Sequence, residues 1–318
     1  MAELRKHEKY DQLIARCRAL APVRTIVVHP CDETSLAGAV EAAASGLIAP
    51  VLVGPERRIR ALAASLRLDL GKLPLVDQRH SHAAAAKAVA LVRAGEGDAL
   101  MKGSLHTDEL LAEVVQKEAG LRTERRLSHV FIMDVPTYAK PLFITDAAVN
   151  IQPTLEDKAD IVRNAVDLAH ALGIARPKVA ILSAVETVTS KIPSTIDAAA
   201  LCKMADRGQI RGALLDGPLA LDNAISREAA ATKEIVSAVA GDADILLVPD
   251  LEAGNMLAKE LTFLANADAA GIVLGARVPI ILTSRADNLR TRMASCAVAA
   301  LYAHARRVAA AETGKLSE

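Results

Sequence analysis

Short apolar runs alternate with helical segments along the first part of the chain, and this alternation restricts the folds open to it. Examples are TIVVH, which stops at Pro30, APVLV, which stops at Gly54, and DALMK, which runs into Gly103. Short runs without polar interruption are typical of strands buried on both faces of a parallel sheet. Helices between such strands give right-handed crossovers. The pattern therefore predicts an α/β fold with a doubly wound parallel sheet, and it favours an open sheet over a closed barrel.

The rhythm changes after His106. Two apolar runs, at 130–135 and 141–145, are separated by a connection short enough for an antiparallel hairpin. A hairpin inside a parallel array usually marks a change of sheet or domain. We expect two closely connected α/β domains, the first formed by 1–137 plus 278–318 and the second by 138–277, with the last helix folding back on the first sheet.

Composition narrows the functional classes. Hydrophobic residues make up 52% of the chain but aromatic residues only 2%, and 38 basic residues balance 38 acidic ones. The chain therefore offers neither the basic field nor the stacking platforms that hold nucleic acid. The four cysteines are scattered, with no CxxC and no zinc spacing, so we expect no metal site. Without a signal-peptide pattern or an apolar run long enough to span a membrane, we expect a cytoplasmic protein.

Four polar groups follow predicted strands, at 102–104, 216–226, 250–255 and 283–287. Because the carboxyl ends of parallel strands meet at one edge of a sheet, these groups are expected to converge on one cleft. At 242–259 we expect a strand that ends at Pro249, then a polar turn to residue 255, and then a helix. Each group alone also fits an ordinary strand-to-helix loop. Helix caps are expected at Thr34 or Ser35, and at Thr154 with Asp157 three residues on.

The densest chemical cluster surrounds the start of the last helix and contains Ser284, Arg285, Asp287, Arg290 and Arg292. Helix N-terminal amides and arginine side chains together bind phosphate or acyl phosphate. The alternative is that Ser284 and Asp287 cap the helix while the arginines lie in water.

A second basic group contains Arg122, Arg125, Arg126 and Ser128. Facing the cleft, it would hold the phosphates of a large anionic cofactor; otherwise it is a solvated loop. The Walker A, GxGxxG and GxSxG motifs are absent. An enzyme of this kind would therefore align two substrates and stabilise charge.

Several long segments, in order, resemble the phosphate acetyltransferase/phosphate butyryltransferase family. They are LMKGSLHTDELL, GLRTERRLSHVFIMDVP, LFITDAAVNIQPTLEDKADIVRNAV, DGPLALDNAIS, ADILLVPDLEAGNMLAKELT and PIILTSRAD. DGPLALDNAIS and LTSRAD are most similar to the butyryltransferase branch and to the transferase half of fused hydratase–phosphate acetyltransferase proteins.

The resemblance implies an enzyme that interconverts acyl-CoA plus phosphate with acyl phosphate plus CoA. It implies two α/β domains around a cleft, as in the isocitrate and isopropylmalate dehydrogenases, and a homodimer. It also implies no metal and no bound cofactor, with coenzyme A acting as substrate. The acyl chain can be acetyl, propionyl or butyryl, and the sequence does not decide between them.

The resemblance also suggests site residues. The acetyl branch has a Ser-Arg pair followed about six residues later by an Asp, whereas here Asp287 follows Ser284-Arg285 after two residues. In a second register, Arg290 takes the Arg position. We expect Ser284, Asp287 and Arg290 to be catalytic, with Asp287 or a nearby carboxylate deprotonating the CoA thiol. The expected substrate-binding residues are Arg125, Arg126, Ser128, Asp216, Asn223, Gly254, Asn255 and Arg285.

Two alternatives remain open at this point. One is a metal- and NAD-dependent hydroxy-acid dehydrogenase of the same fold, which would need an acidic metal cluster. The other is a non-catalytic CoA-binding module.

Overall fold

A computed structural model describes residues 8–283 and 288–315. The chain divides into two compact units. The unit that contains 126–269, with the residues up to 9, is called the central unit because it comes from the middle of the sequence. The unit that contains 10–125 and 270–318 is called the flanking unit because its two segments precede and follow that stretch in the sequence. The expected boundaries at 137/138 and 277/278 lie 12 and 8 residues later in the chain than the divisions at 125/126 and 269/270. The first of them would cut the 128–145 hairpin at its turn, whereas the hairpin belongs as a whole to the central unit.

The flanking unit is a doubly wound sheet with strand order β3-β2-β1-β4-β11-β10. The strands from β3 to β11 are parallel, and β10 runs antiparallel to β11. The strands are β1 (Val23–Val28), β2 (Ile48–Gly54), β3 (Leu75–Asp77), β4 (Ala99–Lys102), β10 (Asp268–Leu274) and β11 (Ile280–Ile281). The helices are α1 (Glu8–Cys17), α2 (Glu33–Ala44), α3 (Glu56–Ser65), α4 (Ser81–Arg93), α5 (Thr107–Val114) and α11 (Leu289–Lys315).

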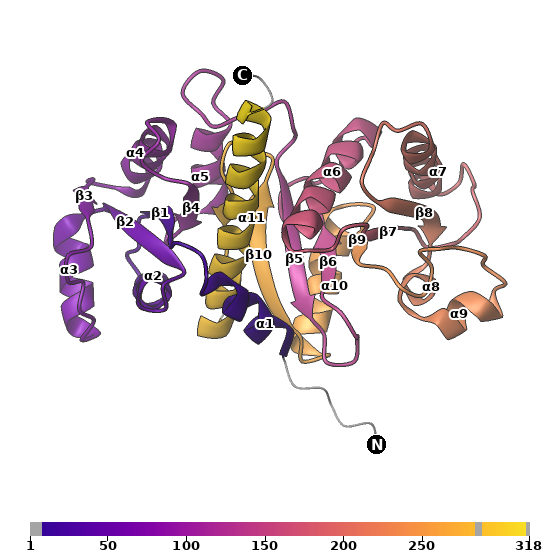
Figure 1. Cartoon of the computed structure of the whole chain (residues 1–318), viewed down its shortest axis with the longest axis horizontal. Coiled ribbons are helices and arrows are strands. Elements are labelled where there is room, and N and C mark those ends of the chain that lie inside the picture. The colour runs from indigo at the N-terminus through magenta and orange to yellow at the C-terminus, as the bar shows by residue number, and fades with distance from the viewer. Residues whose placement is uncertain (1–7, 284–287, 316–318) are drawn as a thin grey trace. The chain divides into compact units, whose positions relative to one another are not determined.

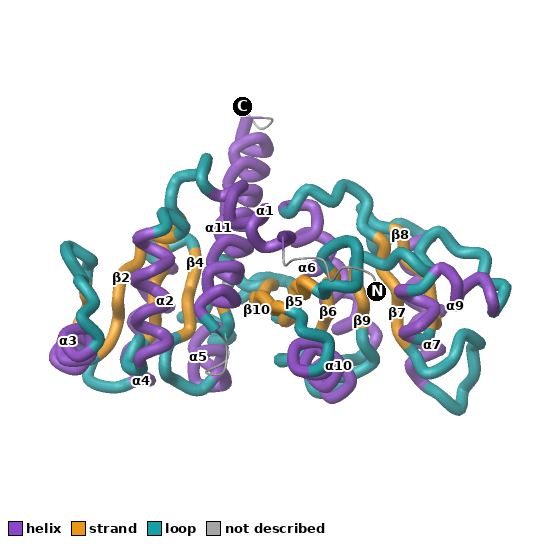
Figure 2. The backbone as a smooth tube through the Cα atoms, turned by 90° about the horizontal axis from the view of Figure 1, so that it is seen from below, coloured by secondary structure: helices purple, strands orange, loops and turns teal. Residues whose placement is uncertain are grey.

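Small residues bring the helices of the flanking unit close to its sheet. On α4, Ala84, Ala85 and Ala88 are fully buried, so the helix needs no large side chain to fill the gap. Helix α2 packs on β2 (Figure 2). Helix α11, yellow in Figure 1, contacts α2, β1 and β11, which confirms that the last helix folds back on this sheet.

The central unit has strand order β5-β6-β9-β7-β8. Strands β5 and β6 form the predicted antiparallel hairpin, and the remaining neighbours are parallel. The strands are β5 (Ser128–Asp134), β6 (Leu142–Thr145), β7 (Lys178–Leu182), β8 (Leu214–Leu219) and β9 (Ile245–Leu247). The helices are α6 (Leu155–Ala171), α7 (Pro193–Asp206), α8 (Leu221–Ile225), α9 (Arg227–Thr232) and α10 (Leu251–Phe263).

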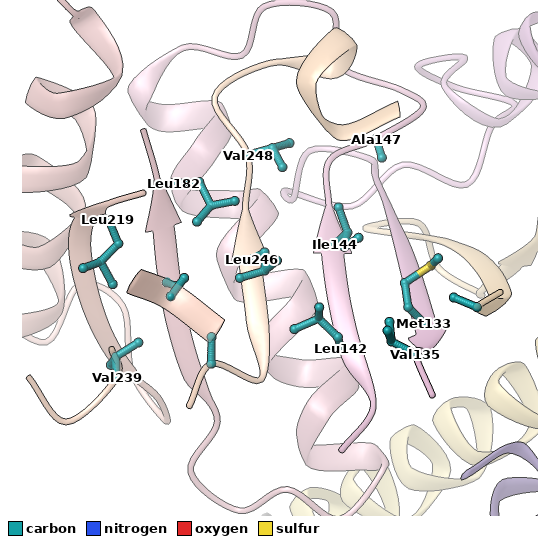
Figure 3. Close-up of a cluster of buried hydrophobic side chains, with 14 of the residues drawn as sticks. Met133, Val135, Leu142, Ile144, Ala147, Leu182, Leu219, Val239, Leu246 and Val248 are labelled. Atoms are coloured by element: carbon teal, nitrogen blue, oxygen red, sulfur yellow. The ribbon is translucent and has the colours of Figure 1, made fainter. Parts of the chain in front are cut away.

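Aliphatic side chains from every strand of the central unit form one core. Figure 3 shows Met133, Ile144, Leu246 and Leu182 in adjacent positions across the sheet. Leu257 of α10 packs against this cluster from one face. The low aromatic content is therefore compatible with a continuous core, because branched aliphatic residues fill it.

Helix starts show where local sequence signals are decisive. Thr154 and Asp157 form the predicted reciprocal cap of α6. The expected turn over 250–255 is wrong: Asp250 accepts a hydrogen bond from the Ala253 amide (2.9 Å), so α10 begins at once. Likewise Asp32, rather than Thr34 or Ser35, caps α2. Among the described residues, no helix is long and apolar enough to cross a membrane.

Candidate active site

The loop after β6 is built around a buried carboxylate. Asp146 is 2% exposed. Its Oδ1 accepts hydrogen bonds from the amides of Ala148 (2.9 Å) and Val149 (3.1 Å), and its Oδ2 accepts from the amide (3.1 Å) and Nδ2 (2.5 Å) of Asn150. Burial raises the pKa of Asp146, while these donors act in the opposite direction. Because all four are donors, they stabilise the ionised form of the carboxylate.

Arg126 is anchored beside this loop. Its Nε donates to Asn150 Oδ1 (2.8 Å), and its Nη1 lies 3.3 Å from Asp157 Oδ1. The backbone is held as well, because its N–H donates to Asp160 Oδ2 (3.0 Å) and its carbonyl accepts from Asn164 Nδ2 (2.9 Å). The side chain is nevertheless 54% exposed. The Arg126 guanidinium is thus partly exposed to solvent while its backbone is held in place by hydrogen bonds.

Helix α10 starts against the same loop. A Cβ at Gly254 would lie 2.8 Å from both Asp146 O and Val248 Cγ2, so the glycine permits this close approach. Asn255 Nδ2 donates to Ala147 O (3.3 Å). Packing inside the central unit thus accounts for Gly254, and the substrate contacts of Gly254 and Asn255 remain predictions.

Three other predicted residues make contacts within the central unit. Ser128 is fully buried, and its Oγ accepts from Asn164 Nδ2 (2.8 Å). Asn223, also fully buried, donates to the Glu186 carboxylate. Asp216 accepts from the Gly217 amide (2.8 Å). Their substrate contacts remain predictions.

In the flanking unit, the carboxyl ends of β1 and β4 meet at His29 and Ser104. His29 has a positive φ of 53°, and Ser104 Oγ lies 3.2 Å from His29 Nδ1 and 3.1 Å from His29 O. A Cβ at Gly103 would lie 2.3 Å from Val28 O, so only glycine permits this crossing. Burial, followed by the nearby charge of Arg58, lowers the pKa of His29. The imidazole is therefore neutral at physiological pH.

Arg292 lies at the carboxyl end of β11. It is 4% exposed, and its Nη1 donates to Thr283 Oγ1 (2.8 Å). A Cβ at Gly38 of α2 would lie 2.9 Å from Arg292 Cδ, so a glycine makes room for the arginine stem. Burial acts to raise the pKa of Asp32, but hydrogen bonds from Ser35, together with nearby Arg292, bring it below its usual value.

The predicted catalytic cluster is only partly described. Ser284, Arg285 and Asp287 lie outside the described residues. Arg290 Nη2 donates to Asp11 Oδ1 of α1 (3.1 Å), so the guanidinium is partly neutralised there. The catalytic role of Arg290 remains a prediction.

Arg125 and Arg126 are consecutive but belong to different units. The backbone N–H of Arg125 donates to Thr123 Oγ1 (3.0 Å) within the flanking unit. The structure therefore supplies anchoring contacts for Arg126 in the central unit, and the substrate contact of Arg125 remains a prediction.

Sequence reasoning missed His29 and Asp32. The signal was present, because a histidine followed by Pro-Cys-Asp ends an apolar run in the same way as the groups that were selected. Within 8–283 and 288–315, no grouping of His, Cys, Asp and Glu has the arrangement of a metal site.

Comparison with known proteins identifies the family. The model for the phosphate acetyl/butaryl transferases matches residues 80–300. A phosphate acetyltransferase of Rhizobium meliloti is 70% identical over 301 residues, covering 95% of each chain. A phosphate butyryltransferase of Clostridium beijerinckii is 43% identical over 296 residues, covering 93% of this chain and 98% of its own.

Solved structures agree. A branched-chain phosphotransacylase from Enterococcus faecalis V583 superposes with a TM-score of 0.77 at 33% identity, covering 88% of this chain and 99% of its own. A 4-hydroxythreonine-4-phosphate dehydrogenase from Burkholderia phymatum has a TM-score of 0.55 at 13% identity, covering 88% of this chain and 98% of its own, and so shares the fold alone.

The chain belongs to the phosphate acetyl/butaryl transferase family, and it is an acyltransferase with the dehydrogenase-like α/β fold predicted from its sequence. The dehydrogenase alternative is not favoured. Relatives with both names are similar to this chain: a phosphate acetyltransferase is 70% identical and a phosphate butyryltransferase is 43% identical. The expected similarity to the butyryl branch therefore does not decide which acyl group is transferred.

Proposed function

We propose that this protein transfers a short acyl group between the thiol of coenzyme A and phosphate. The observation that carries the proposal is the 70% identity with a protein named phosphate acetyltransferase over 95% of both chains. We infer that coenzyme A acts as a substrate, that no cofactor is bound, and that the enzyme is a cytoplasmic homodimer.

The chemistry requires two aligned substrates and a site for negative charge. In the direction of thioester synthesis, the CoA thiolate attacks the acyl carbonyl. The carbon–oxygen bond to phosphate then breaks, and phosphate leaves with the bonding electrons. A free thiol has a pKa of about 8.5, so a nearby carboxylate is sufficient to take its proton, and we assign this role to Asp287. Ser284 and Arg290 would hold the acyl phosphate, with Arg285 contacting the same substrate.

Arg292 extends this assignment. Its guanidinium is buried and donates to Thr283, the residue directly before Ser284. A buried cation stabilises a developing negative charge more strongly than an exposed cation does, because water screens the interaction less. We therefore include Arg292 among the groups that stabilise the leaving phosphate.

The exposed guanidinium of Arg126 suits a phosphate of CoA, and we assign it, with Arg125, to that part of the substrate. The other predicted contacts, from Ser128, Asp216, Asn223, Gly254 and Asn255, are kept as hypotheses. The name of the Rhizobium meliloti relative favours acetyl as the acyl group. A kcat/KM series over acetyl-, propionyl- and butyryl-CoA tests this choice.

The test is thioester formation from acetyl phosphate and CoA. Arg292→Met and Arg290→Ala are each expected to lower kcat/KM by about 10²-fold or more, the usual loss when one transition-state donor is removed. Asp287→Asn is expected to lower it most at low pH, where less thiolate is present.

Asp11→Asn is the matched control, because it breaks the ion pair of Arg290 and keeps the guanidinium. It should retain wild-type activity. Wild-type kcat/KM in both Arg290→Ala and Asp287→Asn would reject the site assignment. CoA binding without turnover of any acyl phosphate would reject the reaction itself and leave a CoA-binding module.

A further inference from the structure

The side-chain amide of Asn150 has one possible orientation. Its Nδ2 donates to Leu127 O (2.8 Å) and to Asp146 Oδ2 (2.5 Å), and its Oδ1 accepts from Arg126 Nε (2.8 Å). A carbonyl and an ionised carboxylate only accept, whereas the Arg Nε–H only donates. A flipped amide would place an acceptor against two acceptors and a donor against a donor. Asn150 therefore holds its oxygen towards Arg126.

The Asp146 carboxylate fixes the orientation of the Asn150 side-chain amide. It is 2% exposed, and both of its oxygens are occupied by donors, two of them from Asn150 itself. The backbone of residues 148–150 is wrapped around the carboxylate. The position of Asn150 Oδ1 is thus set by a buried and rigid group.

The bond from Asn150 leaves the positive charge of Arg126 available. The amide oxygen is neutral, and the carboxylate in contact with the guanidinium is that of Asp157, 3.3 Å from Nη1 at a partly exposed position. Nη2 makes no hydrogen bond with the residues that the structure describes. If the role of this arginine were ion pairing, a direct buried carboxylate would serve it better. A neutral acceptor orients the guanidinium without neutralising it.

We propose that Asp146 and Asn150 are positioning residues that hold the Arg126 guanidinium ready for a phosphate of coenzyme A. This inference rests on the proposed function, which assigns Arg126 to that substrate. An unrestrained arginine loses much of its side-chain conformational entropy when it binds a ligand, whereas the Arg126 side chain is already ordered in the folded protein. Bidentate contact with phosphate also depends on the plane of the guanidinium, and the Nε bond sets that plane.

The experiment compares two thiol substrates. Pantetheine has the reacting thiol of CoA but none of its phosphates, so the ratio of kcat/KM for CoA to that for pantetheine reports on phosphate recognition. In Asn150→Ala this ratio is expected to fall about tenfold, equivalent to ~1.4 kcal/mol, through KM for CoA with little change in kcat.

Asp146→Asn should give the same result. The new amide turns one donor towards Asn150 Nδ2, so Asn150 loses the acceptor that helps to fix its orientation, and its bond to Arg126 Nε is weakened. Arg126→Ala should lower the ratio at least as much, and adding Asn150→Ala to it should change nothing further.

Two further variants keep the test decisive. Arg126→Lys retains the charge but has no Nε–H, so it should lose the CoA preference even if Asn150→Ala does not fold. Asp160→Asn is the matched control, because it removes the charge of Asp160, weakens its contacts with the Arg126 backbone and with Arg163, and leaves the guanidinium contacts of Arg126 intact. It should keep the wild-type ratio.

The outcomes separate the two levels of the argument. If Arg126→Ala keeps the wild-type ratio, the assignment of Arg126 to CoA phosphates fails, and the positioning role fails with it. If Arg126→Ala lowers the ratio but Asn150→Ala and Asp146→Asn do not, only the positioning role is overturned. An equal fall in Asp160→Asn, or equal losses with CoA and pantetheine, would indicate general disorder of the loop and would also overturn it.

Discussion

His129 at the start of β5 should make the central unit sensitive to acid. The side chain is 1% exposed and packs edge-on against Phe131, with 4.3 Å between ring centroids. Among the described residues, neither ring nitrogen has a hydrogen-bond partner. Burial lowers the pKa of His129 from 6.5 to about 3. The folded protein therefore holds the imidazole neutral, whereas the unfolded chain protonates it near its usual pKa.

The sign and size follow by linkage. Because the folded pKa lies below the unfolded one, this contribution to stability is complete above about pH 6.5 and is lost as the pH falls towards 3. Each pH unit inside that window costs about 1.4 kcal/mol. Between pH 7 and pH 5 the loss is therefore about 2 kcal/mol, a large share of the ~5–15 kcal/mol that stabilises a typical domain.

The assay is urea unfolding followed by circular dichroism between pH 7 and pH 5, for the wild type and for His129→Leu. At pH 7 the variant should be at least as stable, because an unpartnered buried polar group costs about 1–3 kcal/mol. At lower pH the variant should lose about 2 kcal/mol less than the wild type. His106→Leu, at an exposed position, controls for the loss of a histidine. Parallel pH profiles for wild type and His129→Leu would refute the reasoning.

Three further predictions concern packing and charge. Gly254→Ala should cost about 1–3 kcal/mol by overpacking, since its Cβ would meet loop backbone at 2.8 Å; an unchanged melting temperature would mean that α10 can shift. Lys9→Met should cost about 3–5 kcal/mol in urea unfolding, because it leaves the fully buried carboxylate of Asp134 unpaired. Arg24→Met breaks an exposed pair and should cost at most ~1 kcal/mol, so equal losses in the two variants would contradict the burial argument. The buried Cys296 thiol, with its pKa raised to about 12, should react with a thiol reagent only after unfolding, and rapid labelling of the native protein at this position would show otherwise.

Local signals predicted much of the fold. The 130–145 hairpin, the cap at Thr154 and the return of the last helix to the first sheet follow from turn length, side-chain chemistry and apolar periodicity, all of which act over a few residues. The helix starts that were misplaced, at Asp32 and Asp250, depend on which of several polar residues captures the first free amides. Those residues compete within one turn, and spacing alone does not decide between them.

The candidate site was less predictable, because its contacts join residues that are distant in the sequence. The sequence marked Arg126 as part of a basic loop, and Gly254 and Asn255 as small or polar residues after a strand, but it could not say what each one faces. Burial decided that Gly254 makes room for the loop backbone, and that Arg292 reaches Thr283 past a glycine of α2. Neither contact follows from separation along the chain.

By itself, the sequence determined the α/β class, the family and the reaction type, because apolar alternation and long motif segments are properties of the chain in order. Only the tertiary structure decided how Asp146, Asn150 and Arg126 act together. Asp146 and Asn150 lie four residues apart, whereas Arg126 comes from the other side of the β5–β6 hairpin and meets them only when those strands pair. Strand pairing and burial bring the Asp146 carboxylate and the Asn150 amide to the positions in which they orient the Arg126 guanidinium.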